Sequence, residues 1–93
     1  MAITVELPSA LQAFAGGTME VTLDDRCGTV GDALGALARR HAGVTDRVVD
    51  ERGELRRHVN VFVDGDNIRF LDGFDTAVRD GSTIVIVPAV SGG

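Results

Sequence analysis

The chain has 93 residues, of which 44% are hydrophobic and 25% are charged, a composition typical of one small globular domain. Its formal net charge is −5, from fourteen acidic residues against nine arginines and no lysine, and such an acidic chain is not expected to bind nucleic acid. A single cysteine, Cys27, excludes an internal disulfide and a cysteine-rich zinc site.

The first two predicted elements are strands. Apolar side chains alternate with polar ones at Ile3, Val5 and Leu7, which is typical of a half-buried strand. The same alternation returns from residue 18 to residue 24, with Met19, Val21 and Leu23 expected to point inward. Because Gly16 and Gly17 lie between the two segments, we expect the chain to turn there and form a hairpin.

One long helix is predicted over residues 29–42. Thr29 can cap its N-terminus, and Asp32 stands where a capping box has its acidic residue. Gly43 is a natural stop, and Gly31 and Gly35 are interpreted as positions of close packing against the sheet. Helical spacing puts five residues on the face expected to be buried: Val30, Leu34, Leu37, Ala38 and His41.

The second half of the chain holds the remaining strands. Residues 44–58 are polar, and we expect an irregular segment with one helical turn at 45–49. A strand follows at 59–63, then a turn at 64–67 and a short return strand at 68–70. The segment 83–88 is apolar on both faces, which predicts a central strand.

These elements predict an α+β fold in which one main helix lies across one face of a mixed sheet of four to five strands. The order is β-β-α-β-(β)-β. We expect one domain over residues 1–88 and a flexible tail over residues 89–93.

Neither a leader nor a membrane anchor is predicted. The N-terminal residues have no basic start and no long apolar run, so they do not resemble a signal peptide. The longest nearly apolar stretch, 84–90, is far shorter than the ~20 residues that span a bilayer. We therefore expect a soluble cytoplasmic protein that does not bind a membrane.

The sequence ends in Gly92-Gly93, which suits delivery of a terminal carboxylate into another protein's active site. Glycine has no Cβ, so such a tail can enter a narrow channel in conformations that other residues avoid. Five extended residues, Ala89, Val90, Ser91, Gly92 and Gly93, reach about 17 Å. The alternative is an ordinary frayed end with no function.

The chain resembles the ThiS/MoaD sulfur carriers, which are ubiquitin-like β-grasp proteins. The resemblance covers essentially the whole chain and rests on the order of elements, the strand 59–61, the Asp80-Gly81 turn and above all the ending 87–93, Val-Pro-Ala-Val-Ser-Gly-Gly. Within the family, the stretch 57–63, the longer polar segment 44–58 and the Pro-Ala-Val before the last residues are similar to the actinobacterial branch that serves cysteine synthesis.

This resemblance implies a mechanism in which the carrier itself catalyses nothing. A ubiquitin-activating-type enzyme, of the MoeB/ThiF kind, would use ATP to adenylate the Gly93 carboxylate. A sulfur donor would then displace AMP and leave a thiocarboxylate on Gly93, whose sulfur an accepting biosynthetic enzyme would transfer to a metabolite. The carrier would bind no cofactor of its own.

The same resemblance implies a docking surface on the open face of the sheet. Ile84 and Ile86 would point inward, so Phe62, Val85 and Val87 would form an exposed apolar patch beside the tail. The alternative is that the segment 44–58 simply covers Phe62. The acidic body as a whole would be steered towards a basic groove on a partner.

Other chemistry-bearing residues are interpreted as structural. Cys27 precedes the helix, but no histidine or acid stands at a spacing typical of a catalytic pair. His41 and His58 alone make a poor metal site, and the acidic turn 64–67 lacks the remaining ligands of a calcium loop, so no metal is expected.

Three functions stay open from the sequence: a sulfur carrier, a ubiquitin-like modifier joined to target lysines through Gly93, and a β-grasp interaction module with an inert tail. Without lysine, the chain cannot be extended into a polymer through lysine side chains. The sequence does not identify the metabolite that would receive the sulfur, or whether proteolysis exposes Gly93.

Overall fold

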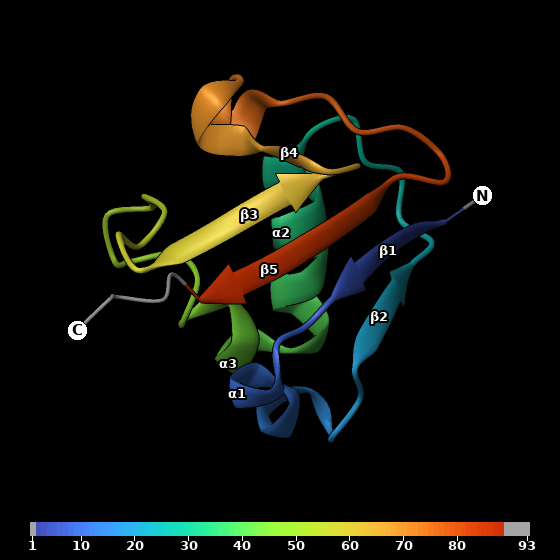
Figure 1. Ribbon diagram of the computed structural model, residues 1–93. Helices are drawn as coiled ribbons and strands as arrows, with labels where there is room; N and C mark the ends of the chain where they lie inside the picture. The colour runs from blue at the N-terminus through green and yellow to red at the C-terminus, as the bar shows by residue number, and fades with distance from the viewer. Residues whose placement is uncertain (1, 89–93) are drawn as a thin grey trace.

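A computed structural model describes residues 2–88 of the chain. Its five strands form one sheet in the order β2-β1-β5-β3-β4, and the long helix α2 lies across one face of that sheet (Figure 1). This is the ubiquitin-like β-grasp arrangement, as predicted. The elements in chain order are β1 (Ile3–Glu6), α1 (Ser9–Gln12), η1 (Ala13–Ala15), β2 (Glu20–Leu23), α2 (Val30–Arg40), α3 (Ala42–Thr45), β3 (Val59–Val63), β4 (Asp66–Asn67), η2 (Ile68–Phe70), η3 (Gly73–Asp75) and β5 (Thr83–Pro88).

β1 and β2 form the predicted antiparallel pair, with Ile3 opposite Leu23 and Val5 opposite Val21. They are not joined by a tight turn, however, because α1 and the 3₁₀ helix η1 fill the connection. The expected inward position of Met19 is also wrong: β2 begins one residue later, and the Met19 side chain is 70% exposed. The connection ends in Gly16 and Gly17, whose φ angles of 70° and 88° suit glycine.

α2 begins with the predicted cap. The Thr29 hydroxyl accepts a hydrogen bond from the Asp32 amide at 3.1 Å, and the Asp32 carboxylate accepts one from the Gly28 amide at 3.0 Å. These bonds satisfy amides that have no partner within the helix. The buried face also follows the prediction at Val30, Leu34 and Leu37, while Ala38 and His41 are only partly buried.

The predictions for the glycines around α2 need correction. A Cβ on Gly31 would lie 3.3 Å from the carbonyl oxygen of Phe74, so Gly31 allows close approach of η3 and not of the sheet. A Cβ on Gly35 would meet nothing within 4 Å. α2 ends at Arg40, before Gly43, and Gly43 lies inside the short helix α3.

The segment 44–58 was expected to be irregular, but several of its apolar residues pack against the rest of the protein. Its helical turn comes earlier than expected, at Ala42–Thr45, and buries Val44. Val48 is also buried, and an isolated bridge joins Val49 to Leu55. These apolar residues fix the segment against the body of the protein.

β3 turns into β4 through Asp64 and Gly65, whose φ angles of 49° and 95° are typical of a two-residue hairpin turn. The expected return strand at 68–70 is wrong. β4 consists of Asp66–Asn67, residues that had been assigned to the turn, and residues 68–70 form the 3₁₀ helix η2. The Asn67 side chain accepts a hydrogen bond from the Arg69 amide at 2.9 Å and thereby starts the helix.

β5 is the central strand, as predicted. It pairs in parallel with β1 and antiparallel with β3. Ile84 and Ile86 are buried under α2, and the alternate residues Val85 and Val87 are only partly buried. The core lies between this inner face and α2.

Within residues 2–88, no helix is long and apolar enough to cross a membrane.

Asp25 ties the connection before α2 to the last turn of that helix. Its carboxylate lies 2.6 Å from an Arg40 nitrogen and 3.0 Å from an Arg39 nitrogen. The hydrogen bonds from Arg40 and Arg39 hold the pKa of Asp25 below its ordinary value. A lowered pKa in the folded state means that the ionised carboxylate stabilises the fold.

We expect Asp25→Asn to lower the free energy of unfolding at neutral pH, measured by urea denaturation across a pH series. The difference in free energy of unfolding between the variant and the wild type should stay constant down to about pH 5. It should disappear as the pH falls below about 4, where Asp25 of the unfolded chain becomes protonated. Glu20→Gln is the matched control, because Glu20 is exposed and has no ion pair within the described residues. If the difference in free energy of unfolding persists in acid, the ionised Asp25 carboxylate is not what stabilises the fold.

Candidate functional site

The end of β5 is the point from which the predicted tail leaves the domain. Pro88, the last residue of the strand, pairs with Val59 at the start of β3. β5 pairs with β1 over residues 83–85 and with β3 as far as Pro88, so its end is held by β3. The tail residues Ala89, Val90, Ser91, Gly92 and Gly93 lie outside the described residues, and their role stays a prediction.

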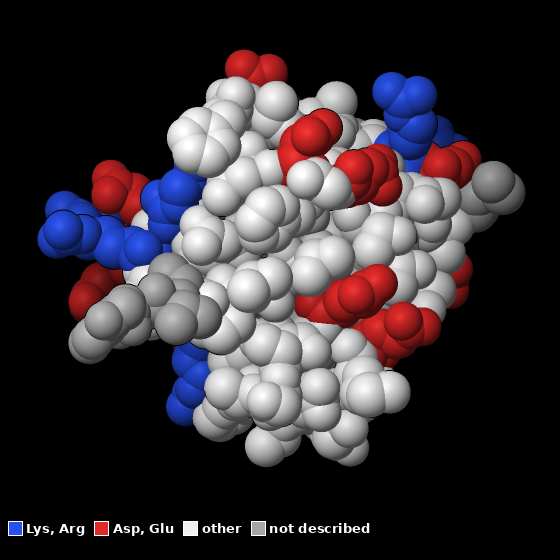
Figure 2. All heavy atoms as spheres, viewed as in Figure 1, with Lys and Arg blue, Asp and Glu red and all other residues white. Residues whose placement is uncertain are grey.

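The three residues predicted to form a docking patch do lie together on the open face of the sheet, opposite α2. Phe62 and Val85 are cross-strand partners, and Val87 is two residues further along β5, opposite Asn60. All three are partly buried, so the segment 44–58 does not fully cover Phe62. Figure 2 shows this face as a broad uncharged surface flanked by acidic side chains. No contact with a partner tests the patch, so docking stays a prediction.

The structure adds exposed apolar residues that the sequence analysis missed. Phe70, the last residue of η2, is 85% exposed, and Leu71, which follows it, is 48% exposed. They were missed because residues 68–70 were expected to form a short return strand. The available signal was Asn67, since an asparagine before a short run of residues is a favoured helix cap.

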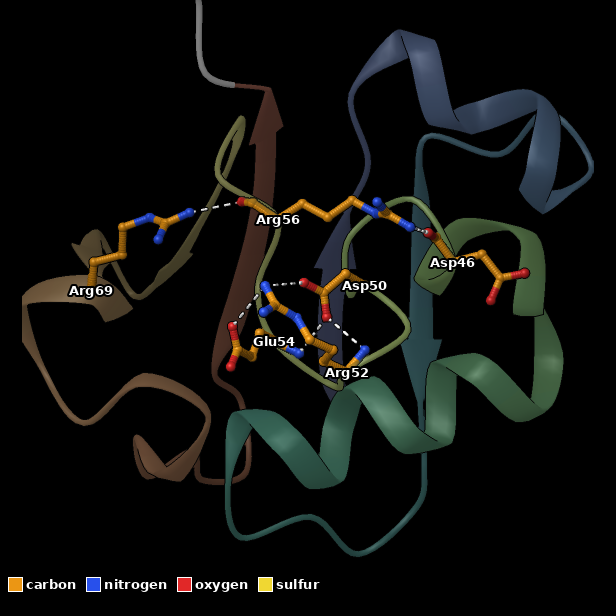
Figure 3. Close-up of polar contacts among 6 residues, drawn as sticks. All are labelled: Asp46, Asp50, Arg52, Glu54, Arg56 and Arg69. Atoms are coloured by element: carbon orange, nitrogen blue, oxygen red, sulfur yellow. Dashed lines mark hydrogen bonds and ion pairs between the residues drawn. The ribbon is translucent and has the colours of Figure 1, made fainter.

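Two arginines hold the segment before β3 in place by hydrogen bonds to main-chain carbonyl oxygens (Figure 3). Arg69 donates hydrogen bonds to the carbonyl oxygens of Arg56, at 2.8 Å, and Val59, at 2.7 Å. Arg56 in turn donates two hydrogen bonds to the carbonyl oxygen of Asp46, at 2.9 and 3.1 Å. These contacts fix the chain where β3 begins, beside the end of β5.

Cys27 has the environment of an unreactive thiol. It packs partly buried against the core before α2. Burial, and then the negative charges of Asp25 and Asp32, raise the pKa of the Cys27 thiol above its ordinary value. Thiolate is the nucleophilic form, so this position disfavours covalent chemistry.

The cavities of the domain lie away from the predicted patch. The larger one, of about 370 Å³, is lined by α2 and the segment 45–53, and its charged lining residues are Asp46 and Asp50. Two carboxylates would repel the phosphates of a nucleotide. Within residues 2–88, no three histidine, cysteine or acidic side chains gather as metal ligands. His41 lies between α2 and α3, and His58 lies just before β3.

Comparison with known proteins identifies the family. Residues 5–93 match the ThiS family. The chain belongs to the ThiS family. It is 36% identical, over an alignment of 99 positions that covers both chains completely, to the sulfur carrier protein CysO of Mycobacterium tuberculosis.

Two solved structures show how far the similarity extends in space for this ThiS-family chain. A crystal structure of the Amycolatopsis orientalis BexX/CysO complex contains a chain that matches with a TM-score of 0.87 and 38% identity, covering 99% of this chain and all of the other. Small archaeal modifier protein SAMP1 of Haloferax volcanii matches with a TM-score of 0.82 and 33% identity over both full lengths. The relatives thus include both sulfur carriers and protein modifiers.

We expect the Cys27 thiol to titrate above about 8.5, the ordinary value for cysteine, when its alkylation by iodoacetamide is followed against pH. Asp25→Asn should lower the midpoint, since it removes a nearby negative charge that disfavours the thiolate. A short peptide containing one cysteine is the control. A midpoint below that of the peptide would reveal an activated thiol and reopen the catalytic interpretation of Cys27.

Proposed function

We propose that this chain is a sulfur carrier whose terminal Gly93 carboxylate is converted to a thiocarboxylate. The observation that supports this most is the full-length similarity to a curated sulfur carrier, combined with a central strand that ends five residues before Gly93. A fixed strand end and a slender tail let the domain dock outside an enzyme while the carboxylate reaches its interior. Five residues extend about 17 Å, which is enough for this separation.

The chemistry requires activation, because a carboxylate has no good leaving group. In the proposed reaction, a Gly93 carboxylate oxygen attacks the α-phosphorus of ATP, pyrophosphate leaves and an acyl-adenylate forms. Sulfide, or an equivalent sulfur donor, then attacks the carbonyl carbon and AMP departs with the bridging oxygen. An activating enzyme of the MoeB/ThiF kind would bind the ATP and perform both steps, so the carrier needs no cofactor and is a co-substrate, not an enzyme.

A second enzyme would consume the thiocarboxylate and place its sulfur in a metabolite. The curated relative named CysO favours cysteine synthesis as the destination. The matching chain of the Amycolatopsis orientalis BexX/CysO complex is a similar protein that is held in a complex with a protein partner. We place both encounters in the cytoplasm, where ATP is available to the activating enzyme.

Intact-protein mass spectrometry tests the proposal directly. After incubation with ATP, sulfide and an activating enzyme of the MoeB/ThiF kind, we expect the mass to rise by the difference between sulfur and oxygen. Fragmentation should locate the change at Gly93. A chain with one alanine appended after Gly93 is the matched control and should not gain mass. No gain by the native chain, with an enzyme shown to activate its own carrier, would reject the proposal.

The apolar patch makes a separate prediction about docking. Val85→Asp should lower kcat/KM for thiocarboxylate formation by about tenfold or more, because a buried interface centre does not tolerate an unpaired charge. Thr22→Asp is the control, since Thr22 is exposed on the same face but at the far edge, on β2. Circular dichroism and thermal unfolding should show that both variants fold. Equal losses in the two variants would remove Phe62, Val85 and Val87 from the docking site.

The similarity to a small archaeal modifier favours a second candidate, conjugation to target lysines through Gly93. The same adenylate would serve, because an amine can attack it in place of sulfide. Lysine-linked adducts of the native chain in extract of its own cells would support this function. If neither adducts nor a thiocarboxylate form, a plain interaction module with an inert tail becomes the better description.

A further inference from the structure

Positive charge is concentrated where the tail begins, although the chain as a whole is acidic. β3 runs antiparallel to β5, so the start of β3 lies beside the end of β5, with Val59 opposite Pro88. Arg56 and Arg57 lie just before β3, separated from it by His58, and Arg69 is hydrogen-bonded to Val59. These three residues, Arg56, Arg57 and Arg69, form what we call the tail-base arginines. In Figure 2, the side of the molecule towards which β5 points in Figure 1 shows several blue side chains, with red ones beside them.

Two of the tail-base arginines are held in place without losing their charge. Arg69 and Arg56 donate their hydrogen bonds to main-chain carbonyl oxygens, at 2.7 to 3.1 Å. A carbonyl oxygen orients a guanidinium group but does not neutralise it. The side chains therefore need little further ordering when a partner binds, which lowers the entropic cost of docking.

Two carboxylates of the same segment, those of Asp50 and Glu54, are paired with Arg52, whereas Glu51 is exposed and forms no ion pair within residues 2–88. Asp50 and Glu54 lie 3.6 and 3.4 Å from Arg52, and Figure 3 shows the Asp46 carboxylate pointing away from Arg56. Asp50 also accepts two main-chain hydrogen bonds, at 2.9 Å each, which together with nearby arginines keep its pKa below the ordinary value. Within residues 2–88, ion pairs involve Arg39, Arg40 and Arg52, and none involves a tail-base arginine.

We propose that the tail-base arginines dock against an acidic protein surface at the mouth of the channel through which the activating enzyme receives the tail. The proposal rests on the proposed function, because it places the tail in such a channel. Carboxylates match this surface better than a nucleic acid does, since the chain carries a net charge of −5 that phosphates would repel. The exposed Phe70 next to Arg69 adds an aromatic residue, and arginine with aromatic residues is typical of interface centres.

This surface changes what charge is expected to do in the encounter. The net charge alone favours a basic partner surface, but the end that must approach first is basic. A partner with an acidic channel mouth would attract that end and repel the rest of the carrier. The electrostatic field would thus orient the domain with its tail towards the channel before contact.

The test compares two charge reversals that change the net charge equally. Arg57→Glu alters the tail base, and Arg57 is exposed with no side-chain hydrogen bond within the described residues. Arg26→Glu is the control: Arg26 is also exposed, but it follows β2, at the opposite end of the sheet from Pro88. The association rate constant with the activating enzyme is measured by stopped-flow fluorescence at low and high salt, and circular dichroism checks folding.

We expect Arg57→Glu to slow association about tenfold at low salt, while Arg26→Glu changes it less than about twofold. The difference should shrink at about 0.5 M salt, where charges are screened over a few ångströms. Equal effects of the two variants, or faster association of Arg57→Glu, would overturn the proposal. If binding depends on Arg57 but no thiocarboxylate forms, the docking surface is retained and the sulfur-carrier chemistry is rejected. If both variants are converted to the thiocarboxylate at the normal rate, the sulfur-carrier chemistry is retained and the docking surface is rejected.

Discussion

The position of β5 between β1 and β3 is the constraint on which the rest of the structure depends. A strand with hydrogen-bonded neighbours on both sides cannot slide or twist away without breaking two ladders. Ile84 and Ile86 lock its register, because a shift by one residue would expose both and bury Val85 and Val87 instead. The first half of β5 is therefore fixed by two ladders and its end by the β3 ladder, so whatever follows Pro88 starts from a defined place.

The same register determines what surrounds that point. Since β3 pairs with β5 from Val59 to Val63, Phe62 must stand beside Val85 on the open face, and the residues before Val59 must lie at the end of β5. The apolar patch and the tail-base arginines thus both follow from the pairing of β3 with β5. The patch lies on the open face of the sheet, and the arginines lie at its end. A partner that recognises the domain near the tail meets both surfaces together.

Much of this could be predicted from the sequence, because it depended on local patterns. Alternation gave β1 and β3, the continuous apolar run at 83–88 gave β5, and the Thr29–Asp32 spacing gave the start of α2. The errors came where side-chain contacts between distant segments decided the outcome. Residues 68–70 became a 3₁₀ helix because Asn67 caps it and also bonds Asn60, at 3.3 Å, across the hairpin. No periodicity reports a bond of that kind, nor the bonds from Arg69 to residues 56 and 59.

The distribution of charge could not be predicted from the sequence either, and it matters more for function than the details of the fold. Counting residues gives a net charge of −5 and suggests a basic partner, but a count contains no positions. In the fold, Arg52 pairs with two carboxylates, Asp50 and Glu54, and Asp25 pairs with two arginines, Arg39 and Arg40, so each group keeps one unit of net charge, negative in the first and positive in the second. Arg56 and Arg69 bond main-chain carbonyls and Arg57 is exposed, so none of the three forms an ion pair within residues 2–88, although the charge of Arg56 helps to lower the pKa of Asp50. The residues that are left uncompensated, not the total, therefore determine the field that an approaching enzyme meets at the base of the tail.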